Sequence, residues 1–206
     1  MRLTWPNRIT LARFLAIPVF VILVLRIQDD DYGGLYRRMA LGLFLILALA
    51  DAADGWLARR LHQQTRLGSV LDPLADKLLI TIACVLLAIP EVVQPPIPKW
   101  LAVLAVSRDL FILIGSLVLY LLIGRLYIHP TGLGRACTVS LTLTILAALL
   151  VGLLPTPAGR EWGARILVVL ACVAGALTVA SGLHYGWLGR SQLGAAAEEP
   201  FEPPER

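Results

Sequence analysis

The sequence predicts an all-α integral membrane protein with six transmembrane helices and a short N-terminal interfacial segment. The chain has 206 residues, is 58% hydrophobic and is only 16% charged, which is far from the balance of an average soluble domain. Its apolar residues gather into runs that, with flanking small and polar residues, approach the about 20 residues that a helix needs to cross a bilayer. These runs fall at residues 9–25, 39–50, 78–89, 101–124, 136–154 and 166–188.

The first run does not have the form of a signal peptide. No small-residue cleavage site follows it, and Arg13 lies inside it. Residues 1–7 precede the run, and Trp5 among them is the kind of side chain that sits at headgroup depth. We therefore expect these residues to form the interfacial lead-in.

Two pairs of aspartates make the second and third runs look short. Asp51 and Asp54 follow the second run three positions apart, and Asp72 and Asp76 precede the third run four positions apart. Residues three or four apart share a helical face. Two facing helices would therefore bring four carboxylates together, an all-oxygen cluster that suits hard divalent cations.

A carboxylate at membrane depth costs several kcal/mol, so the four aspartates need a positive counterpart. Mg²⁺ usually completes its coordination with substrate phosphates, which makes a phosphate-bearing substrate the natural inference. A structural polar network or an ion-conducting site is the alternative. A cation transporter would, however, leave Gly55, Ala58 and Arg59 beside the aspartates without a role.

The remaining runs each carry a polar interruption. Ser107-Arg108-Asp109 breaks the fourth run, and Pro130 to Thr138 opens the fifth. His184-Tyr185-Gly186 lies near the end of the sixth, and His184 alone is typical of an interfacial residue. We expect the membrane domain to cover residues 1–190, and the polar residues 191–206 to be a disordered tail.

The charge and the cysteines of the chain indicate the environment in which the protein works. The net charge of +4 suits contact with anionic lipids, and nothing resembles a nucleic-acid footprint. A cytoplasmic N-terminus puts the basic 59–66 loop in the cytoplasm and Arg37 and Arg38 on the opposite side, an orientation that the positive-inside rule favours. The three cysteines are expected to be small buried hydrophobes rather than disulfide partners or metal ligands: Cys84, Cys137 and Cys172.

The segment from Asp51 to Asp76 has the pattern Asp-x2-Asp-Gly-x2-Ala-Arg-x8-Gly-x3-Asp-x3-Asp. It resembles the signature of the CDP-alcohol phosphotransferase family, and the resemblance extends from Pro6-Asn7 to His184-Tyr185-Gly186. That resemblance implies a six-helix membrane bundle, usually a homodimer. It also implies an enzyme that moves a phosphoryl-alcohol group from a CDP-linked donor to a hydroxyl and releases CMP.

The resemblance assigns a role to each motif position. It implies that the aspartates hold one or two Mg²⁺ or Mn²⁺ ions, two being expected, and that Asp76 is also the general base. Small residues let the nucleotide approach the backbone, and an arginine can bind phosphate or cytosine oxygens with two nitrogens. The expected metal ligands are Asp51, Asp54, Asp72 and Asp76, and the expected binding residues for the CDP moiety are Asp54, Gly55, Ala58, Arg59 and Gly68.

The acceptor is indicated by other residues. Arg108 could bind the phosphate of the acceptor or form a satisfied ion pair with Asp109, and Arg135 could bind phosphate or anchor the helix end. Arg135 stands where relatives carry a lysine, so the positive charge is retained and a bidentate guanidinium is gained. Arg13 could support a substrate phosphate or pair with an aspartate, and Lys77 could balance charge or extend to the interface.

Two acceptors fit the family resemblance. His184-Tyr185-Gly186 and Ser107-Arg108-Asp109 are similar to eukaryotic-type cardiolipin synthases, which implies that CDP-diacylglycerol donates its phosphatidyl group to phosphatidylglycerol. Pro6-Asn7 to Arg13 resembles members that use glycerol-3-phosphate or phosphatidylglycerol, so phosphatidylglycerophosphate synthesis is the alternative. The location expected is a bacterial inner membrane, with the N-terminus and active site on the cytoplasmic side.

Overall fold

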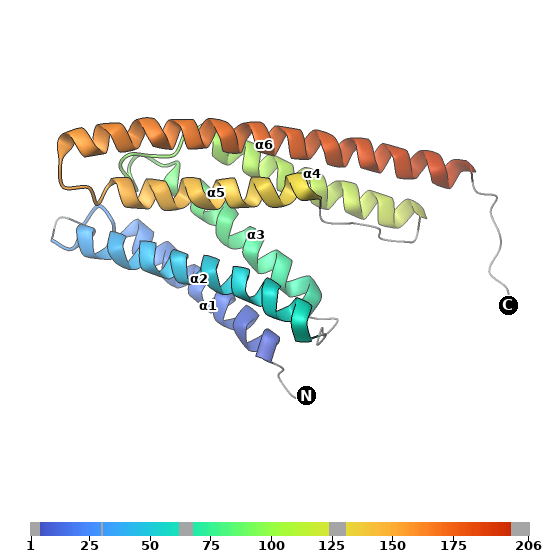
Figure 1. Ribbon diagram of the computed structural model, residues 1–206, viewed down its shortest axis with the longest axis horizontal. Coiled ribbons are helices and arrows are strands. Elements are labelled where there is room, and N and C mark those ends of the chain that lie inside the picture. The colour runs from blue at the N-terminus through green and yellow to red at the C-terminus, as the bar shows by residue number, and fades with distance from the viewer. Residues whose placement is uncertain (1–4, 30, 62–67, 124–130, 199–206) are drawn as a thin grey trace.

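The computed structural model is an all-helical bundle over the residues it describes, which are 5–29, 31–61, 68–123 and 131–198 (Figure 1). Side chains are described except at 5–11, 51–61, 68–76, 119–120, 122–123, 189 and 191–198. The helices in chain order are α1 Trp5–Leu25, α2 Gly33–Leu61, α3 Gly68–Leu87, α4 Lys99–Ile123, α5 Gly132–Val151 and α6 Pro157–Glu198. Each expected apolar run lies mostly on one of them, although the runs at 78–89, 101–124 and 136–154 extend past the ends of α3, α4 and α5.

Helix starts follow from capping chemistry. Thr131 precedes α5, and its side-chain oxygen accepts a hydrogen bond from the backbone N–H of Gly134 at 3.1 Å. Thr156 does the same for α6, accepting from the N–H of Gly159 at 3.1 Å. Pro157 is the first residue of α6, where a missing N–H leaves no bond unmade.

Figure 1 shows α4, α5 and α6 running side by side, while α1, α2 and α3 run obliquely to them. Helix α5 is the shared element, since it packs against α6, α2 and α3. Helix α3 links the two groups by packing against α1, α4 and α5. An arrangement of this kind lets side chains of α3, α4, α5 and α6 meet at one place.

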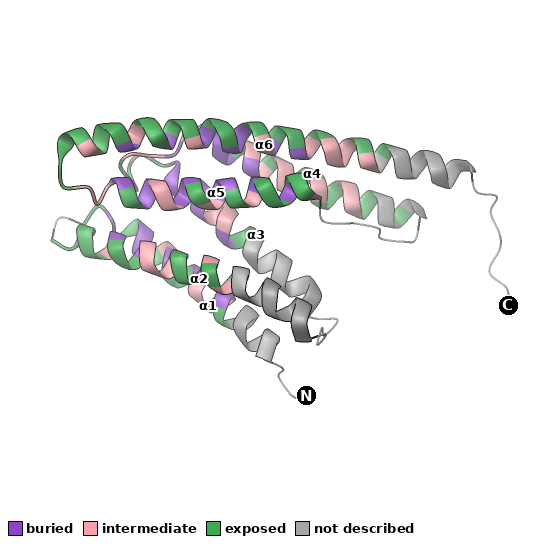
Figure 2. Ribbon diagram, in the orientation of Figure 1, coloured by how far each residue is buried: buried purple, intermediate pink, exposed green. Residues whose placement is uncertain are grey.

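Buried apolar side chains fill the space between the helices, and exposed ones cover the outside (Figure 2). Phe20 of α1 and Phe44 of α2 pack with ring centroids 5.6 Å apart. Large apolar side chains such as Leu113, Leu121 and Val169 are more than 60% exposed. Such an apolar outer face suits a lipid environment, where side chains on the outside gain nothing from being polar.

Within the part of the chain that the structure describes, four helices are long and apolar enough to cross a membrane by length and composition: residues 33–50, 99–118, 132–151 and 157–188. Apolar stretches of α1 and α3, at 12–25 and 77–87, are shorter among the described residues. The protein is therefore helical and suited to a membrane, whereas crossing by all six helices stays a prediction.

Two expectations change in the structure. Helix α6 continues to Glu198, so residues 191–198 are helical where a disordered tail was expected. Leucine, glutamine and three consecutive alanines in this stretch are good helix formers and can extend a helix already begun. Residues 199–206 lie outside the described residues. Cys84 and Cys137 are buried, but Cys172 is exposed on the outer face of α6.

Candidate functional site

The aspartate motif occupies the adjoining ends of two consecutive helices. Asp51 and Asp54 lie in the last turns of α2, and Asp72 and Asp76 lie in the first turns of α3. Both pairs are thus one helical turn apart, as the proposed metal site requires. The side chains of this quartet, and those of Ala58 and Arg59, are not described, and Gly55 and Gly68 are described only by their place in the helices. The metal and nucleotide assignments therefore stay predictions.

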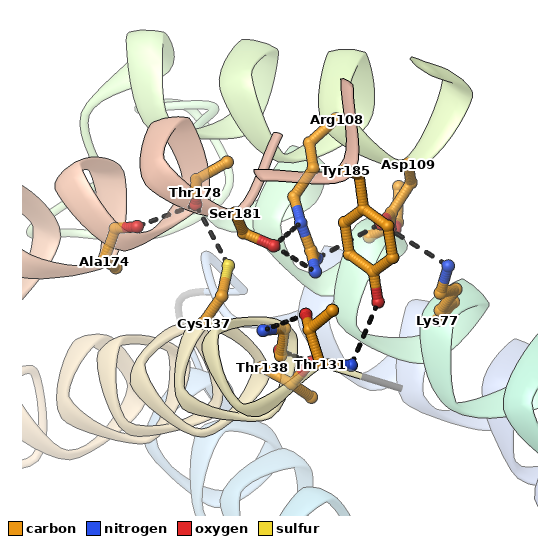
Figure 3. A network of polar contacts seen from close by, with 12 residues as sticks. Lys77, Arg108, Asp109, Thr131, Cys137, Thr138, Ala174, Thr178, Ser181 and Tyr185 are labelled. Carbon is orange, nitrogen blue, oxygen red and sulfur yellow. Dashed lines mark hydrogen bonds and ion pairs between the residues drawn. The ribbon is translucent and has the colours of Figure 1, made fainter. Parts of the chain in front are cut away.

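Just beyond the quartet, a charged cluster joins α3 to α4 (Figure 3). The carboxylate of Asp109 lies 3.4 Å from Nη1 of Arg108 and 3.9 Å from Nζ of Lys77. Thr81, one turn after Lys77 in α3, donates its hydroxyl to the other Asp109 oxygen at 3.2 Å. Arg108 is 9% exposed and Asp109 24% exposed, so both charges are largely removed from solvent and need each other.

The guanidinium of Arg108 also reaches α6. Its Nε and Nη2 atoms donate to the Ser181 hydroxyl at 3.2 and 3.1 Å, and Ser181 is fully buried. Helix α4 is therefore tied to α6 through Arg108 and to α3 through Asp109. The sequence left Arg108 open between an ion pair and a phosphate ligand. The structure shows the ion pair, and a guanidinium with five N–H groups retains donors beyond those used here.

Tyr185 lies one turn after Ser181 in α6 and points to the start of α5 (Figure 3). Its phenol oxygen accepts a long hydrogen bond, 3.4 Å, from the backbone N–H of Thr131. Gly134, in the first turn of α5, lies close to this phenol oxygen. A Cβ placed on Gly134 would lie 3.2 Å from the Tyr185 oxygen, 3.2 Å from Oγ1 of Thr131 and 3.4 Å from Nη2 of Arg108. Three hydrogen-bonding groups thus surround one point beside the first turn of α5, a set we call the Gly134 cradle.

Arg135 does not enter this cluster. Its side chain is exposed, and no hydrogen bond or ion pair joins it to the side chains that the structure describes. Its backbone N–H bonds to the Thr131 carbonyl at 3.2 Å. The structure therefore brings together Arg108, Lys77 and Asp109, while phosphate binding by Arg135 stays a prediction.

Two other basic residues named from the sequence have clear positions. Arg13 is buried in α1 with 3% of its surface exposed, so it does not point into solvent. His184 is half-buried beside Tyr185, and its ring stacks on Trp187 with centroids 6.3 Å apart. An interfacial position for His184 stays a prediction.

Several residues of the cluster were not assigned a role from the sequence. Thr81 and Ser181 were not noticed, and Tyr185 and Thr131 were noticed only as parts of longer motifs. The available signal was spacing, because Lys77 and Thr81, like Ser181 and Tyr185, are polar residues four apart in apolar helices. That spacing places each pair on one face of its helix but does not reveal the partner helix.

Comparison with known proteins decides the family. A sequence model described as CDP-alcohol phosphatidyltransferase matches residues 3–180. The chain belongs to the CDP-alcohol phosphatidyltransferase family. It is thus an enzyme of phospholipid synthesis, and the family implies a CDP-diacylglycerol donor with an alcohol acceptor such as glycerol-3-phosphate or phosphatidylglycerol.

Individual relatives carry two kinds of name. A CDP-diacylglycerol–glycerol-3-phosphate 3-phosphatidyltransferase of Pseudomonas fluorescens is 34% identical over 184 residues, 87% of each chain. The enzyme with the same name in Bacillus subtilis is 36% identical over 112 residues, 50% of this chain and only about half, 55%, of the relative. A cardiolipin synthase (CMP-forming) / mitochondrial hydrolase fusion protein of Schizosaccharomyces pombe is 34% identical over 194 residues, 88% of this chain and 30% of the relative. Two activities are therefore named among the relatives of this phosphatidyltransferase.

Proposed function

We propose that this phosphatidyltransferase is a cardiolipin synthase, which transfers the phosphatidyl group of CDP-diacylglycerol to phosphatidylglycerol. The observation that carries the proposal is the charge of the cluster around Arg108. Arg108 and Lys77 supply two positive charges, and Asp109, in contact with both, removes one. The cluster thus has a net charge of +1 among the described side chains.

A net charge of +1 matches one acceptor better than the other. The phosphodiester of phosphatidylglycerol carries a single negative charge, whereas a phosphate monoester such as glycerol-3-phosphate carries close to two at about pH 7. A dianion in a partly buried site requires several converging cations. Arg108 with one carboxylate already bound to it suits the monoanionic lipid.

The surroundings of the cluster also favour a lipid acceptor. Phe111, Ile114 and Leu117, which follow Asp109 along α4, are all more than half exposed. An acyl chain of a lipid acceptor can contact this apolar face of α4 close to Arg108. The name of the Schizosaccharomyces pombe relative, which covers 88% of this chain, gives independent support.

The proposed reaction is the transfer of a phosphatidyl group, in which one P–O bond forms and another breaks. The free glycerol hydroxyl of phosphatidylglycerol attacks the diacylglycerol-bearing phosphorus of the donor, and a new P–O bond forms. The P–O bond to CMP breaks and its electron pair leaves with CMP. Asp76, as general base, takes the proton of the attacking hydroxyl. A divalent metal held by Asp51, Asp54, Asp72 and Asp76 would supply charge stabilisation on the phosphate oxygens.

Donor binding is proposed for the rest of the motif. Gly55 and Ala58 leave space for the CDP moiety along α2, and Arg59 binds its oxygens through a planar guanidinium. Gly68 begins α3, and its small size would let the second pair of aspartates approach the same donor. A homodimer with a cytoplasmic active site completes the proposal on the strength of the family resemblance and of the basic 59–66 loop.

The second candidate is phosphatidylglycerophosphate synthesis, with glycerol-3-phosphate as acceptor. The observation that favours it is the Pseudomonas fluorescens relative, whose name states this acceptor and which aligns with 87% of the chain. In that case Arg135, exposed one residue beyond Gly134, would have to turn toward the acceptor and supply the additional charge.

An acceptor competition tests the proposal. Purified protein in detergent receives CDP-diacylglycerol and Mg²⁺ with phosphatidylglycerol, glycerol-3-phosphate or both, and the lipid products and CMP are identified by mass. Cardiolipin with CMP is expected. Phosphatidylglycerophosphate as the main product would overturn the choice of acceptor while leaving the family assignment intact. Asp76→Asn serves as the control and should lower turnover by about a hundredfold or more if Asp76 is the base.

A further inference from the structure

We infer that Tyr185 is a specificity-determining residue of this enzyme, and that its phenol O–H, beside the Arg108 guanidinium, binds the phosphodiester of the acceptor. The inference rests on the proposed function, because it assigns a ligand contact on the acceptor side of that site. It adds a residue that belongs neither to the aspartate motif nor to the expected phosphate ligands Arg108 and Arg135.

The position of Tyr185 brings its hydroxyl next to a charged donor. The Tyr185 oxygen and Nη2 of Arg108 lie 3.2 and 3.4 Å from the same point, the Cβ site of Gly134. They come from different helices, α6 and α4 (Figure 3), and both lie next to Gly134. A glycine at this position keeps the point open, since any side chain there would press against both groups.

The phenol proton is available for a ligand. The Tyr185 oxygen accepts from the Thr131 N–H, and none of the other described residues accepts its proton. A tyrosine hydroxyl donates one hydrogen bond as well as accepting. Arg108 also retains N–H groups beyond the three that bond to Ser181 and Asp109. Adjacent O–H and N–H donors can therefore bind two oxygens of one phosphate.

The charge of the phenol explains why it would select the acceptor. Tyr185 donates a hydrogen bond without adding a positive charge to a cluster whose net charge is +1. A phosphodiester monoanion is neutralised by that cluster, whereas a phosphomonoester dianion would retain excess negative charge in a partly buried place. A cation in the position of Tyr185 would instead favour the phosphomonoester dianion over the phosphodiester monoanion.

The competing explanation is that Tyr185 only ties α6 to the start of α5 through Thr131. Binding measurements separate the two. Affinities for glycerophosphoglycerol, the soluble headgroup of the lipid acceptor, and for glycerol-3-phosphate are measured by phosphorus NMR titration of the full-length protein in detergent without donor. Tyr185→Phe keeps the ring and removes the hydroxyl, and Tyr32→Phe, at an exposed position in the turn before α2, is the matched control.

Tyr185→Phe is expected to weaken glycerophosphoglycerol about tenfold, as for one hydrogen bond to a charged group, with little change in melting temperature. Tyr185→Lys is expected to raise the affinity for glycerol-3-phosphate relative to glycerophosphoglycerol. Unchanged affinities in Tyr185→Phe, or an equal loss for both ligands together with a lower melting temperature, would overturn the assignment of Tyr185.

The same preparations keep this result distinct from the proposed function. Wild-type protein that makes phosphatidylglycerophosphate instead of cardiolipin contradicts the proposed function whatever the titrations give. Wild-type protein that makes cardiolipin while Tyr185→Phe binds glycerophosphoglycerol normally contradicts the role of Tyr185 alone.

Discussion

Two nearly buried arginines stand at opposite ends of α5, and they are satisfied in different ways. Arg37 of α2 is 6% exposed and donates from Nε and Nη2 to the carbonyls of Leu149 and Ala148, at 2.9 and 2.8 Å. Arg108 of α4 is bound instead by side chains, the Ser181 hydroxyl and the Asp109 carboxylate. Both place a full positive charge inside an apolar bundle.

The difference between the partners indicates a difference of role. The last carbonyls of a helix have no partner within it, and they carry its negative dipole end, so Arg37 completes the C-terminus of α5 with groups that cannot move away. Ser181 and Asp109 are side chains that can rotate away from Arg108. If Arg108 leaves Asp109 to bind a ligand, Lys77 still provides a positive partner for the Asp109 carboxylate. We therefore interpret Arg37 as a structural cap and Arg108 as a ligand-binding residue.

The largest expected change in stability comes from removing the structural arginine, Arg37. Arg37→Met should destabilise the protein by about 3 kcal/mol, because two hydrogen bonds from a charged group to buried carbonyls are lost. Thermal unfolding in detergent measures the change. The ratio of cardiolipin to phosphatidylglycerophosphate formed by the remaining folded protein should not move. A shift in that ratio would contradict a purely structural role.

The next effect tests the other arginine. Arg108→Gln should lower kcat/KM for the acceptor about fiftyfold with a smaller change in unfolding temperature, because the charge–phosphate contact is worth more than the bond to Ser181. Steady-state kinetics at varied acceptor and saturating donor provide the number. If stability falls as far as in Arg37→Met while KM for the acceptor is normal, Arg108 belongs with Arg37 as a structural residue.

Replacing a glycine by alanine at each end of α5 tests whether the two arginines have different roles. A methyl group on Gly152 would overlap the guanidinium of Arg37, so Gly152→Ala should expel the guanidinium. Its effect on the free energy of unfolding should be non-additive with that of Arg37→Met, since both remove one set of bonds.

Gly134→Ala is the matched partner, because the contacts in the Gly134 cradle are 3.2 to 3.4 Å and need only a small shift. It should raise the KM for the acceptor by about fivefold, a loss of about 1 kcal/mol of binding, with little change in stability. Equal destabilisation by Gly134→Ala and Gly152→Ala would show that the two ends of α5 are alike.

The smallest effect is expected midway along the α5–α6 contact. Thr178 of α6 lies 3.2 Å from the Cys137 sulfur of α5, and its hydroxyl donates to the Ala174 carbonyl at 2.7 Å. Thr178→Val keeps the shape and removes a local bond, so the free energy of unfolding should change by less than about 1 kcal/mol. A loss as large as that for Arg37→Met, measured by the same unfolding assay, would contradict this ranking.

The helices themselves could be predicted because their signals are local. Apolar runs of the right length and residues such as Thr131 and Pro157 mark elements without reference to the rest of the chain. The aspartate motif was equally accessible, since its spacing within α2 and α3 depends only on helical periodicity. The hydrogen bonds of Arg37 could not be predicted in this way, because its partners lie more than 100 positions away in α5.

By itself, the sequence determined the helical membrane class, the aspartate pattern with its family, and the candidate chemistry of a CDP-linked phosphatidyl transfer. Only the tertiary structure decided that Arg108, Tyr185 and Thr131 converge on Gly134, and that Arg135 stays outside. The physical reason is that composition and periodicity act within one helix. The meeting of side chains from α4, α5 and α6 depends instead on how those helices pack, which no local pattern records.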